Sequence, residues 1–172
     1  FCYVGSISVQ RGIFEMLELV SRLNFKLHLA GSFTDQRTMQ AAKEHKGWEN
    51  VVYHGYVNKA EMEVIYSECT CGLLLLHEIE TFRTSLPVKL FEYMKFGLPI
   101  LSSGANEYNL LIKDAECGVV SDVSVEAIIN EAINLNADKS ALKKMSANGL
   151  KHVSKYSWKT EESKLMNIYG GF

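Results

Sequence analysis

Short apolar runs alternate along the chain with longer stretches in which apolar residues recur every three or four positions. The short runs have the length of buried strands, and the longer stretches have the period of amphipathic helices. The run CGLLLL at 71–76 is apolar throughout, which is typical of a strand buried on both faces of a parallel sheet. The pattern predicts strands over residues 1–5, 26–31, 50–55, 71–76, 99–103 and 117–121.

The segments between and after these runs are predicted to be helices. They cover residues 11–23, 34–45, 59–69, 106–113, 124–135, 139–154 and 157–169, and one more helix lies within 83–102. The apolar face of the helix at 124–135 consists of Val125, Ile128, Ile129, Ala132 and Ile133. This regular alternation predicts an α/β fold, a Rossmann-like, doubly wound, mainly parallel six-stranded sheet flanked by helices. We expect residues 1–172 to form a single domain.

In sheets of this kind, ligands bind at the carboxyl ends of the strands, near the point where the strand order reverses. The loops at these ends are residues 5–12, 31–34, 55–58, 77–87 and 102–108. The fourth of these loops leads into RTSLPVKLFEYMKFGLPILS (83–102), which contains both prolines of the chain.

The two prolines, Pro87 and Pro99, frame the helix within this segment. We expect Thr84 and Ser85 to cap its start and Pro87 to occupy its first turn. Gly97 is expected to end the helix after about three turns. A helix start carries unpaired N–H groups and the positive end of the helix dipole, so it is a natural binding site for an anion.

Three charged residues near these loops have two interpretations each. Lys89 and Glu92 lie three positions apart, so they form either a surface ion pair worth about 0.2–0.5 kcal/mol or part of a ligand site. In a ligand site, a carboxylate one turn from a phosphate-binding helix start is placed to accept hydrogen bonds from ribose hydroxyls. Arg11 ends the loop GSISVQRG and is either solvated or bound to phosphate oxygens. This loop has neither a GxGxxG nor a Walker A sequence.

The composition is that of an ordinary globular protein and excludes several classes of function. The chain has 47% hydrophobic and 22% charged residues, a net charge of −2 and a pI near 6.2, so nucleic acid is not an expected partner. No apolar run approaches the roughly 20 residues that span a bilayer. The chain opens with FCYVG, which already has the pattern of a strand, so we expect it to be a piece of a longer polypeptide.

The residue types that usually hold a metal or cofactor show no suitable pattern, and we expect neither. The four cysteines form no CxxC pair, and we expect most of them to be small buried hydrophobes in a reducing, cytosolic setting. The five histidines show no ligand spacing, and there is no Asp-x-Asp pair that would hold Mg²⁺ or Mn²⁺.

From Val4 to about Tyr169, the chain resembles the C-terminal, donor-binding domain of GT-B fold glycosyltransferases of family 4, the glycosyl transferases group 1. The similarity rests on YVGSISVQRGI, KLHLAGSF, VVYHGYVNKAEMEVIYSECTCGLLLL, SLPVKLFEYMKFGLPILSS and the closing YSW. The resemblance implies a retaining, metal-independent enzyme. Such an enzyme transfers a sugar from a nucleoside-diphosphate sugar to a saccharide or lipid-linked acceptor, as in bacterial polysaccharide and glycoconjugate biosynthesis.

The resemblance also implies roles for individual residues. It places Glu92 against the ribose and segment 55–57 against the base. The diphosphate is expected to meet the helix start near Val88 and Lys89, with Arg11 beside it, and both cations would stabilise the leaving diphosphate. The implied binding residues are Gly5, Ser6, Arg11, Gly12, Gly31, Tyr56, Val57, Thr84, Ser85, Val88, Lys89 and Glu92.

Two positions depart from the family pattern. Ser6 stands where the loop usually has an arginine, and Thr84 stands in place of the first glutamate of a Glu-x7-Glu pair that ends at Glu92. That first glutamate normally contacts the donor sugar. These departures leave open a non-catalytic interaction module whose donor site has degenerated. A nucleotide-sugar 2-epimerase-like domain, which is built on a related two-domain scaffold, is a second alternative.

The resemblance finally implies a partner domain. Acceptors bind mostly to an N-terminal domain that this chain lacks, so we expect the chain alone to bind donor without turnover. The terminal helix, about residues 156–172, is placed to pack back on that domain. The expected location is the cytoplasm, and the resemblance leaves open peripheral association of the full-length protein with the inner face of the membrane.

Overall fold

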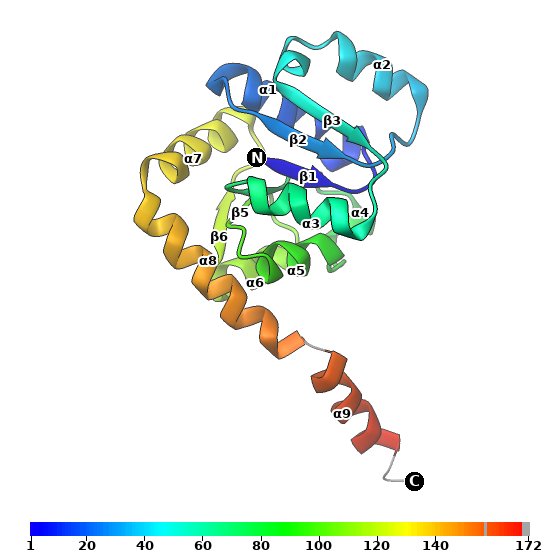
Figure 1. The fold of residues 1–172 in the computed structure, drawn as a ribbon, viewed down its shortest axis with the longest axis vertical. Coiled ribbons are helices and arrows are strands. Elements are labelled where there is room, and N and C mark those ends of the chain that lie inside the picture. Colours follow the sequence, from blue (N-terminus) through cyan, green and yellow to red (C-terminus); the bar gives the residue numbers. More distant parts are fainter. Residues whose placement is uncertain (157, 170–172) are drawn as a thin grey trace.

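The computed structural model describes residues 1–156 and 158–169, and it contains a six-stranded sheet between two layers of helices (Figure 1). The strands are β1 (Cys2–Val4), β2 (Leu27–Ala30), β3 (Val51–Gly55), β4 (Gly72–Leu74), β5 (Ile100–Ser103) and β6 (Gly118–Ser121). All neighbouring strands are parallel, in the order β3-β2-β1-β4-β5-β6. The predicted fold and strands are confirmed. The strand order reverses between β1 and β4, so the carboxyl ends of these two strands mark the expected site.

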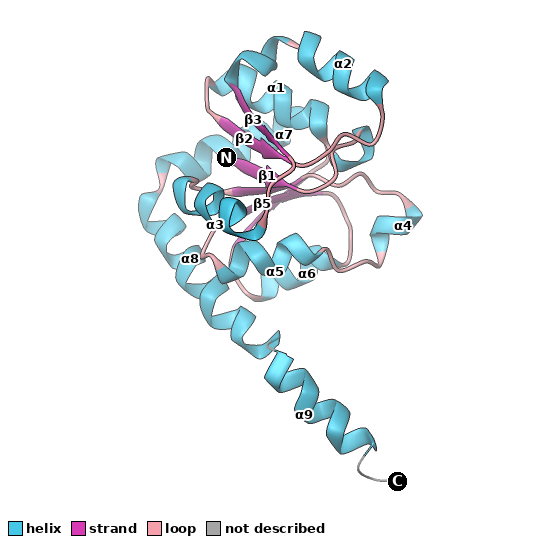
Figure 2. Ribbon diagram, turned by 45° about the vertical axis from the view of Figure 1, so that its right-hand side comes forward, coloured by secondary structure: helices cyan, strands magenta, loops and turns pink. Residues whose placement is uncertain are grey.

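The helices cover both faces of the sheet (Figure 2). One layer contains α1 (Ile13–Leu23), α2 (Gln36–Glu44) and α7 (Val125–Ala137), and the other contains α3 (Lys59–Glu68), α5 (Val88–Lys95) and α6 (Tyr108–Asp114). The next helix, α8 (Lys139–Val153), joins the two layers and packs against α5. The short elements are η1 (Val9–Arg11), η2 (Lys46–Asn50), η3 (Ser154–Tyr156) and α4 (Glu80–Arg83), which the periodicity did not predict.

The apolar periodicity located the helices correctly but not every buried position. In α7 the predicted residues Ile128, Ile129 and Ala132 are buried, whereas the side of the helix that carries Ile133 faces solvent and leaves that residue 47% exposed. Leu135 is buried in its place. The error arises because Ile133 lies next to the apolar stripe, and the sequence does not show how wide a stripe the neighbouring helices cover.

The helix α5 is shorter than predicted. It spans eight residues, about two turns, and Pro87 precedes it in an extended conformation instead of occupying its first turn. The predicted caps are also wrong, because Thr84 ends α4 and no side chain caps α5. At the other end, Gly97 has a φ of +63°, and its N–H donates to the carbonyl of Met94. This confirms the predicted glycine stop.

The last helix, α9 (Trp158–Tyr169), extends away from the rest of the domain (Figures 1 and 2). Its described apolar side chains Leu165, Met166, Ile168 and Tyr169 are exposed. The predicted terminal helix is therefore present, although residues 157 and 170–172 of that prediction lie outside the described part of the chain. Its packing on another domain stays a prediction. None of the described helices has the length and apolar character needed to cross a membrane.

Two glycines with the same backbone conformation provide a test of this packing. Gly12 (φ +77°) and Gly55 (φ +65°) both lie in the left-handed region. A Cβ on Gly12 would lie 2.3 Å from the carbonyl oxygen of Leu75, whereas a Cβ on Gly55 would meet nothing within 4 Å. We expect Gly55→Ala to lower the free energy of unfolding by about 1–2 kcal/mol, the cost of the left-handed conformation alone. Gly12→Ala should cost about 1–3 kcal/mol more, because β4 must move. Urea unfolding of both variants measures the difference, and equal losses would contradict the close approach of η1 to β4.

Candidate functional site

Three glycines form a continuous row at the carboxyl ends of β1, β2 and β3. The N–H of Gly31 donates to the carbonyl of Gly55 at 2.6 Å, and a Cβ on Gly31 would lie 1.9 Å from the carbonyl oxygen of Gly5. With a φ of +125° at Gly31, a side chain would also strain the backbone. The row continues into Tyr56, which is 86% exposed, and the half-buried Val57. The predicted residues of the first three loops therefore share one edge of the sheet.

Lys89 extends from the start of α5 to the end of β1. Its side chain is buried, with 8% of the residue exposed, and Nζ lies 3.9 Å from the ring centroid of Tyr3. A Cβ on Gly5 would lie 2.8 Å from Nζ, so the glycine leaves room for the ammonium group. Among the described residues, no carboxylate lies within 4 Å of Nζ. The interpretation of Lys89 and Glu92 as an exposed surface pair is therefore wrong.

The environment of Lys89 opposes its positive charge. Burial, and to a smaller extent the nearby Arg11 guanidinium, lower the pKa of the ammonium from its usual 10.5 to about 7, and the Glu92 carboxylate partly opposes the fall. A buried cation without a contacting anion is costly, and an anionic ligand would remove much of that cost. The Nζ is therefore suited to binding an anion that enters from the carboxyl edge.

Arg11 supplies a second cation beside Lys89. It ends η1 and precedes α1, which begins at Ile13, so it does not lie in the first turn of that helix as the sequence suggested. Its guanidinium carbon lies 5.1 Å from the ring centroid of Phe82, a cation–π contact between the two loops. Burial raises the pKa of Tyr3 to about 12, and the neighbouring Arg11 opposes that rise. Arg11 and Tyr3 also line the same small crevice.

The start of α5 lies beside the two cations and has no side-chain cap. The first N–H groups of a helix have no partner within it, so those of Val88 and Lys89 are available to a ligand. Val88 is 72% exposed there. The hydroxyl of Ser85 donates to the carbonyl of Phe82 at 3.2 Å, and Thr84 is exposed at the end of α4. The helix start thus offers N–H groups to an anion, whereas the predicted binding roles of Thr84 and Ser85 stay predictions.

Glu92 lies one turn further along α5 and is half-buried. The hydroxyl of Tyr66, on α3, donates to its Oε2 at 3.1 Å. Burial raises the pKa of Tyr66 well above its usual value, and the Glu92 carboxylate adds to the rise. Tyr66 therefore stays a hydrogen-bond donor and fixes the carboxylate. The sequence predicted the helix that carries Tyr66 but not this contact.

Three aromatic residues of the site were not predicted as site residues: Tyr3, Tyr66 and Phe82. Their roles depend on contacts between distant segments. The sequence only placed Tyr3 in an apolar run, Tyr66 in a predicted helix and Phe82 in the loop 77–87. Ser6, which replaces the usual loop arginine, is exposed, and its carbonyl accepts a hydrogen bond from the Tyr3 hydroxyl at 2.8 Å. In the described part of the chain no group of three or more His, Cys, Asp or Glu side chains is arranged to hold a metal ion.

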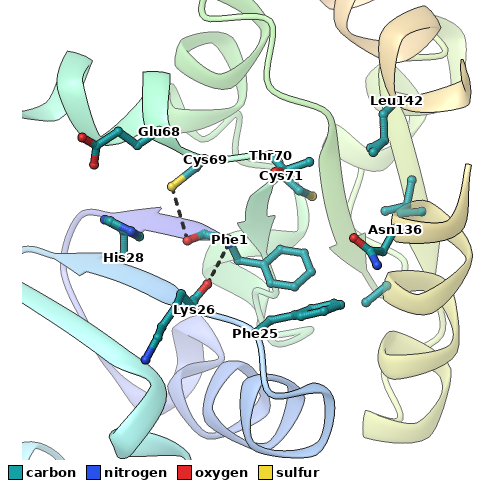
Figure 3. A pocket seen from close by; sticks show the side chains of 12 residues that line it. Phe1, Phe25, Lys26, His28, Glu68, Cys69, Thr70, Cys71, Asn136 and Leu142 are labelled. Atoms are coloured by element: carbon teal, nitrogen blue, oxygen red, sulfur yellow. Dashed lines mark hydrogen bonds between the residues drawn. The ribbon is translucent and has the colours of Figure 1, made fainter. Parts of the chain in front are cut away.

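A separate cavity of about 250 Å³ lies at the opposite, amino edge of the sheet (Figure 3). Phe1 and Phe25 extend into it, and the Cys69 thiol donates to the carbonyl of Phe1 at 3.5 Å. None of the predicted site residues lines this cavity. Of the four free cysteines, Cys2, Cys71 and Cys117 are buried as predicted, whereas Cys69 is partly exposed.

Residues 1–152 match the model of the family described as "Glycosyl transferases group 1". A search of curated proteins by sequence finds no significant match.

Several solved structures share the fold at low sequence identity. Sucrose-phosphate synthase from Thermosynechococcus elongatus has a TM-score of 0.81 at 16% identity, and the alignment covers 98% of this chain and 44% of that one. HepE from Anabaena, solved in complex with UDP, has a TM-score of 0.82 at 14% identity, with 100% and 49% covered. The C-terminal domain of a glycosyl transferase group 1 family protein from Francisella tularensis has a TM-score of 0.72 at 18% identity, with 91% and 86% covered. This chain thus spans about half the length of the first two proteins.

The pKa of Lys89 predicts how stability depends on pH. Unfolded, Lys89 keeps its proton up to about pH 10.5, whereas the folded residue releases it near pH 7. Between these values the unfolded state binds more protons, so raising the pH stabilises the folded state. We expect the free energy of unfolding of the wild type, minus that of Lys89→Met, to rise steadily from pH 7 to pH 9.5. Cysteines and tyrosines titrate in both proteins and cancel. If this difference in unfolding free energy does not change with pH, Lys89 is solvated and its pKa is not lowered by folding.

Proposed function

This chain belongs to the glycosyl transferases group 1 family, and on that premise we propose that it is the donor-binding domain of a glycosyltransferase. The family and the Rossmann-like fold, shared with the C-terminal halves of GT-B glycosyltransferases, support sugar transfer. One observation carries the proposal for the site. The buried Lys89, Arg11 and the uncapped start of α5 lie together where the strand order reverses. This is the place and the charge that a nucleoside diphosphate requires.

The diphosphate is proposed to bind the N–H groups of Val88 and Lys89, the Lys89 ammonium and the Arg11 guanidinium. When the bond between the anomeric carbon of the sugar and the diphosphate oxygen breaks, negative charge accumulates on the leaving diphosphate. The two cations and the helix dipole stabilise that charge most in the transition state. We propose on this basis a metal-independent transfer, with retention as the family resemblance implies.

The nucleoside is proposed to lie along the row of glycines. Glu92 accepts hydrogen bonds from the ribose hydroxyls, with Oε2 held by Tyr66. The base rests against Tyr56 and Val57, whose positions at the end of β3 leave Tyr56 exposed. Gly5 leaves room for the Lys89 ammonium, and Gly12 and Gly31 let the loops that form the site approach one another closely. HepE from Anabaena was solved with UDP and glucose, which makes UDP the first ligand to test.

The full-length protein is proposed to add an N-terminal domain that binds a saccharide or lipid-linked acceptor. The chain alone would then bind donor without transferring the sugar. The exposed apolar residues of α9 would pack on that domain. The proposed location is the cytoplasm, with peripheral contact of the full-length protein with the membrane. Ser6 and Thr84 leave the donor sugar with fewer contacts than the family pattern supplies. If the full-length protein binds no nucleotide, a non-catalytic interaction module replaces this proposal.

Calorimetry with UDP and uridine tests the diphosphate site. We expect the wild type to bind UDP much more tightly than uridine. Arg11→Ala should weaken UDP binding by about 1.5–3 kcal/mol, the cost of a lost charge-assisted contact, and leave uridine unchanged. Arg37→Ala, on the exposed surface of α2, is the matched control and should change neither. Equal losses for UDP and uridine in Arg11→Ala would place Arg11 away from the diphosphate.

A second experiment tests Glu92 against the ribose. Glu92→Gln keeps the size of the side chain but removes its charge and one acceptor, so UDP binding should weaken by about 1.5–3 kcal/mol. The same substitution should matter little for 2′,3′-dideoxy-UDP, which lacks both hydroxyls. Tyr66→Phe serves as the control, because it removes the donor to Oε2 and keeps the carboxylate. A coupling energy of zero between Glu92 and the ribose hydroxyls would remove Glu92 from the site.

A further inference from the structure

We propose that Tyr3 is a positioning residue that holds Lys89 and Arg11 side by side at the donor site. The inference rests on the proposed function, since it assigns a role within that same site. Tyr3 is 1% exposed, so a ligand cannot reach its ring. Any effect of Tyr3 on ligand binding must therefore pass through the two cations.

The ring of Tyr3 provides the contact that Lys89 otherwise lacks. Its face lies 3.9 Å from Nζ, and the negative face of an aromatic ring attracts a cation. This attraction grows when the cation is desolvated, as Lys89 is. The charged and titratable groups facing Lys89 are Tyr3 from β1, Arg11 from η1 and Glu92 from its own helix. Of these, Tyr3 is the one within direct contact distance of Nζ.

The hydroxyl of Tyr3 serves the loop and the second cation. It donates to the carbonyl of Ser6 at 2.8 Å, which anchors the loop between β1 and η1. The Arg11 guanidinium lies near the same hydroxyl and also contacts the Phe82 ring. Cations and rings thus alternate in the order Lys89, Tyr3, Arg11 and Phe82. Each ring receives a cation, so two positive charges that repel each other remain next to one diphosphate site.

Tyr93 provides a control, because it is a buried tyrosine in the core on the other face of the sheet, and among the described residues no cation lies over its ring. It is fully buried on α5, and its hydroxyl donates to the carbonyl of Leu73 at 3.2 Å. Tyr93→Phe and Tyr3→Phe both remove one buried hydroxyl from a backbone carbonyl. If Tyr3 were merely a core aromatic residue, the two substitutions would have the same kind of effect, confined to stability.

The test uses two measurements on the 172-residue chain. The first is the NMR titration of the Lys89 side chain without ligand, assigned by the signal that Lys89→Met lacks. The second is the affinity for UDP and for uridine between pH 6 and 8.5. The variants are Tyr3→Leu, Tyr3→Phe and the chain with pentafluorophenylalanine at position 3, in which the ring keeps its shape but its face no longer attracts a cation.

We expect Tyr3→Leu to lower the pKa of Lys89 further and to weaken UDP binding at pH 7.5 by about tenfold, with uridine unchanged. The UDP loss should shrink at pH 6, where a larger fraction of Lys89 is protonated in the variant. Tyr3→Phe keeps the ring face, so the Lys89 pKa should stay close to that of the wild type, and UDP affinity should fall by about threefold through the loosened loop. The fluorinated ring should behave like Tyr3→Leu, and it decides the question if Tyr3→Leu does not fold.

The outcomes separate this inference from the proposed function. If wild-type chain does not bind UDP, the donor site is wrong, but the Lys89 titration still measures the contact with Tyr3. If the fluorinated ring leaves the Lys89 pKa and the ratio of UDP to uridine affinity as they are in Tyr3→Phe, the ring does not hold Lys89 and the inference fails. A change in stability alone, equal to that of Tyr93→Phe, also overturns it.

Discussion

The cost of burying the Lys89 ammonium is the constraint on which the site depends. A desolvated cation with no contacting carboxylate is unfavourable, and burial lowers its pKa to about 7. The surrounding groups reduce this cost without removing it. Tyr3 presents an aromatic face, Gly5 leaves space for the ammonium, and Glu92 acts from one helical turn away. An anionic ligand would supply the missing charge, so the free energy of folding and the affinity for a diphosphate are linked through one side chain.

The parallel sheet makes this arrangement possible. Reversal of the strand order between β1 and β4 places the loop after β1 and the loop before α5 on the same edge, although the two loops are far apart in the sequence. Close approach then depends on the absence of side chains at a few points. Gly12 lies against the carbonyl of Leu75, and Gly31 lies against that of Gly5. Larger residues at either position would push the loops apart and separate Arg11 from Lys89.

Much of the fold could be predicted from the sequence because its elements obey local rules. Apolar runs and helical periodicity located every strand and all the long helices, and Gly97 marked the end of α5. The start of α5 was predicted too early, because Thr84 and Ser85 are good caps in isolation, whereas Pro87 holds the preceding backbone extended. The burial of Lys89 could not be predicted at all. This burial depends on how α5 packs against β1. The i,i+3 spacing of Lys89 and Glu92 fits a surface ion pair equally well.

In the proposed donor site, the departure at Ser6 would change how the site acquires its positive charge. A loop arginine at position 6 would be permanently protonated, whereas Lys89 with a pKa near 7 is only partly so before a ligand arrives. Binding of a diphosphate favours the charged lysine and so draws a proton from solvent. Part of the binding free energy is then spent on protonating and holding Lys89. As a result, Lys89 is most fully protonated when the anion is bound. In a glycosyl transfer, the negative charge on the diphosphate is greatest when it separates from the sugar. A site with fewer fixed charges therefore depends more heavily on the groups that keep Lys89 and Arg11 in place.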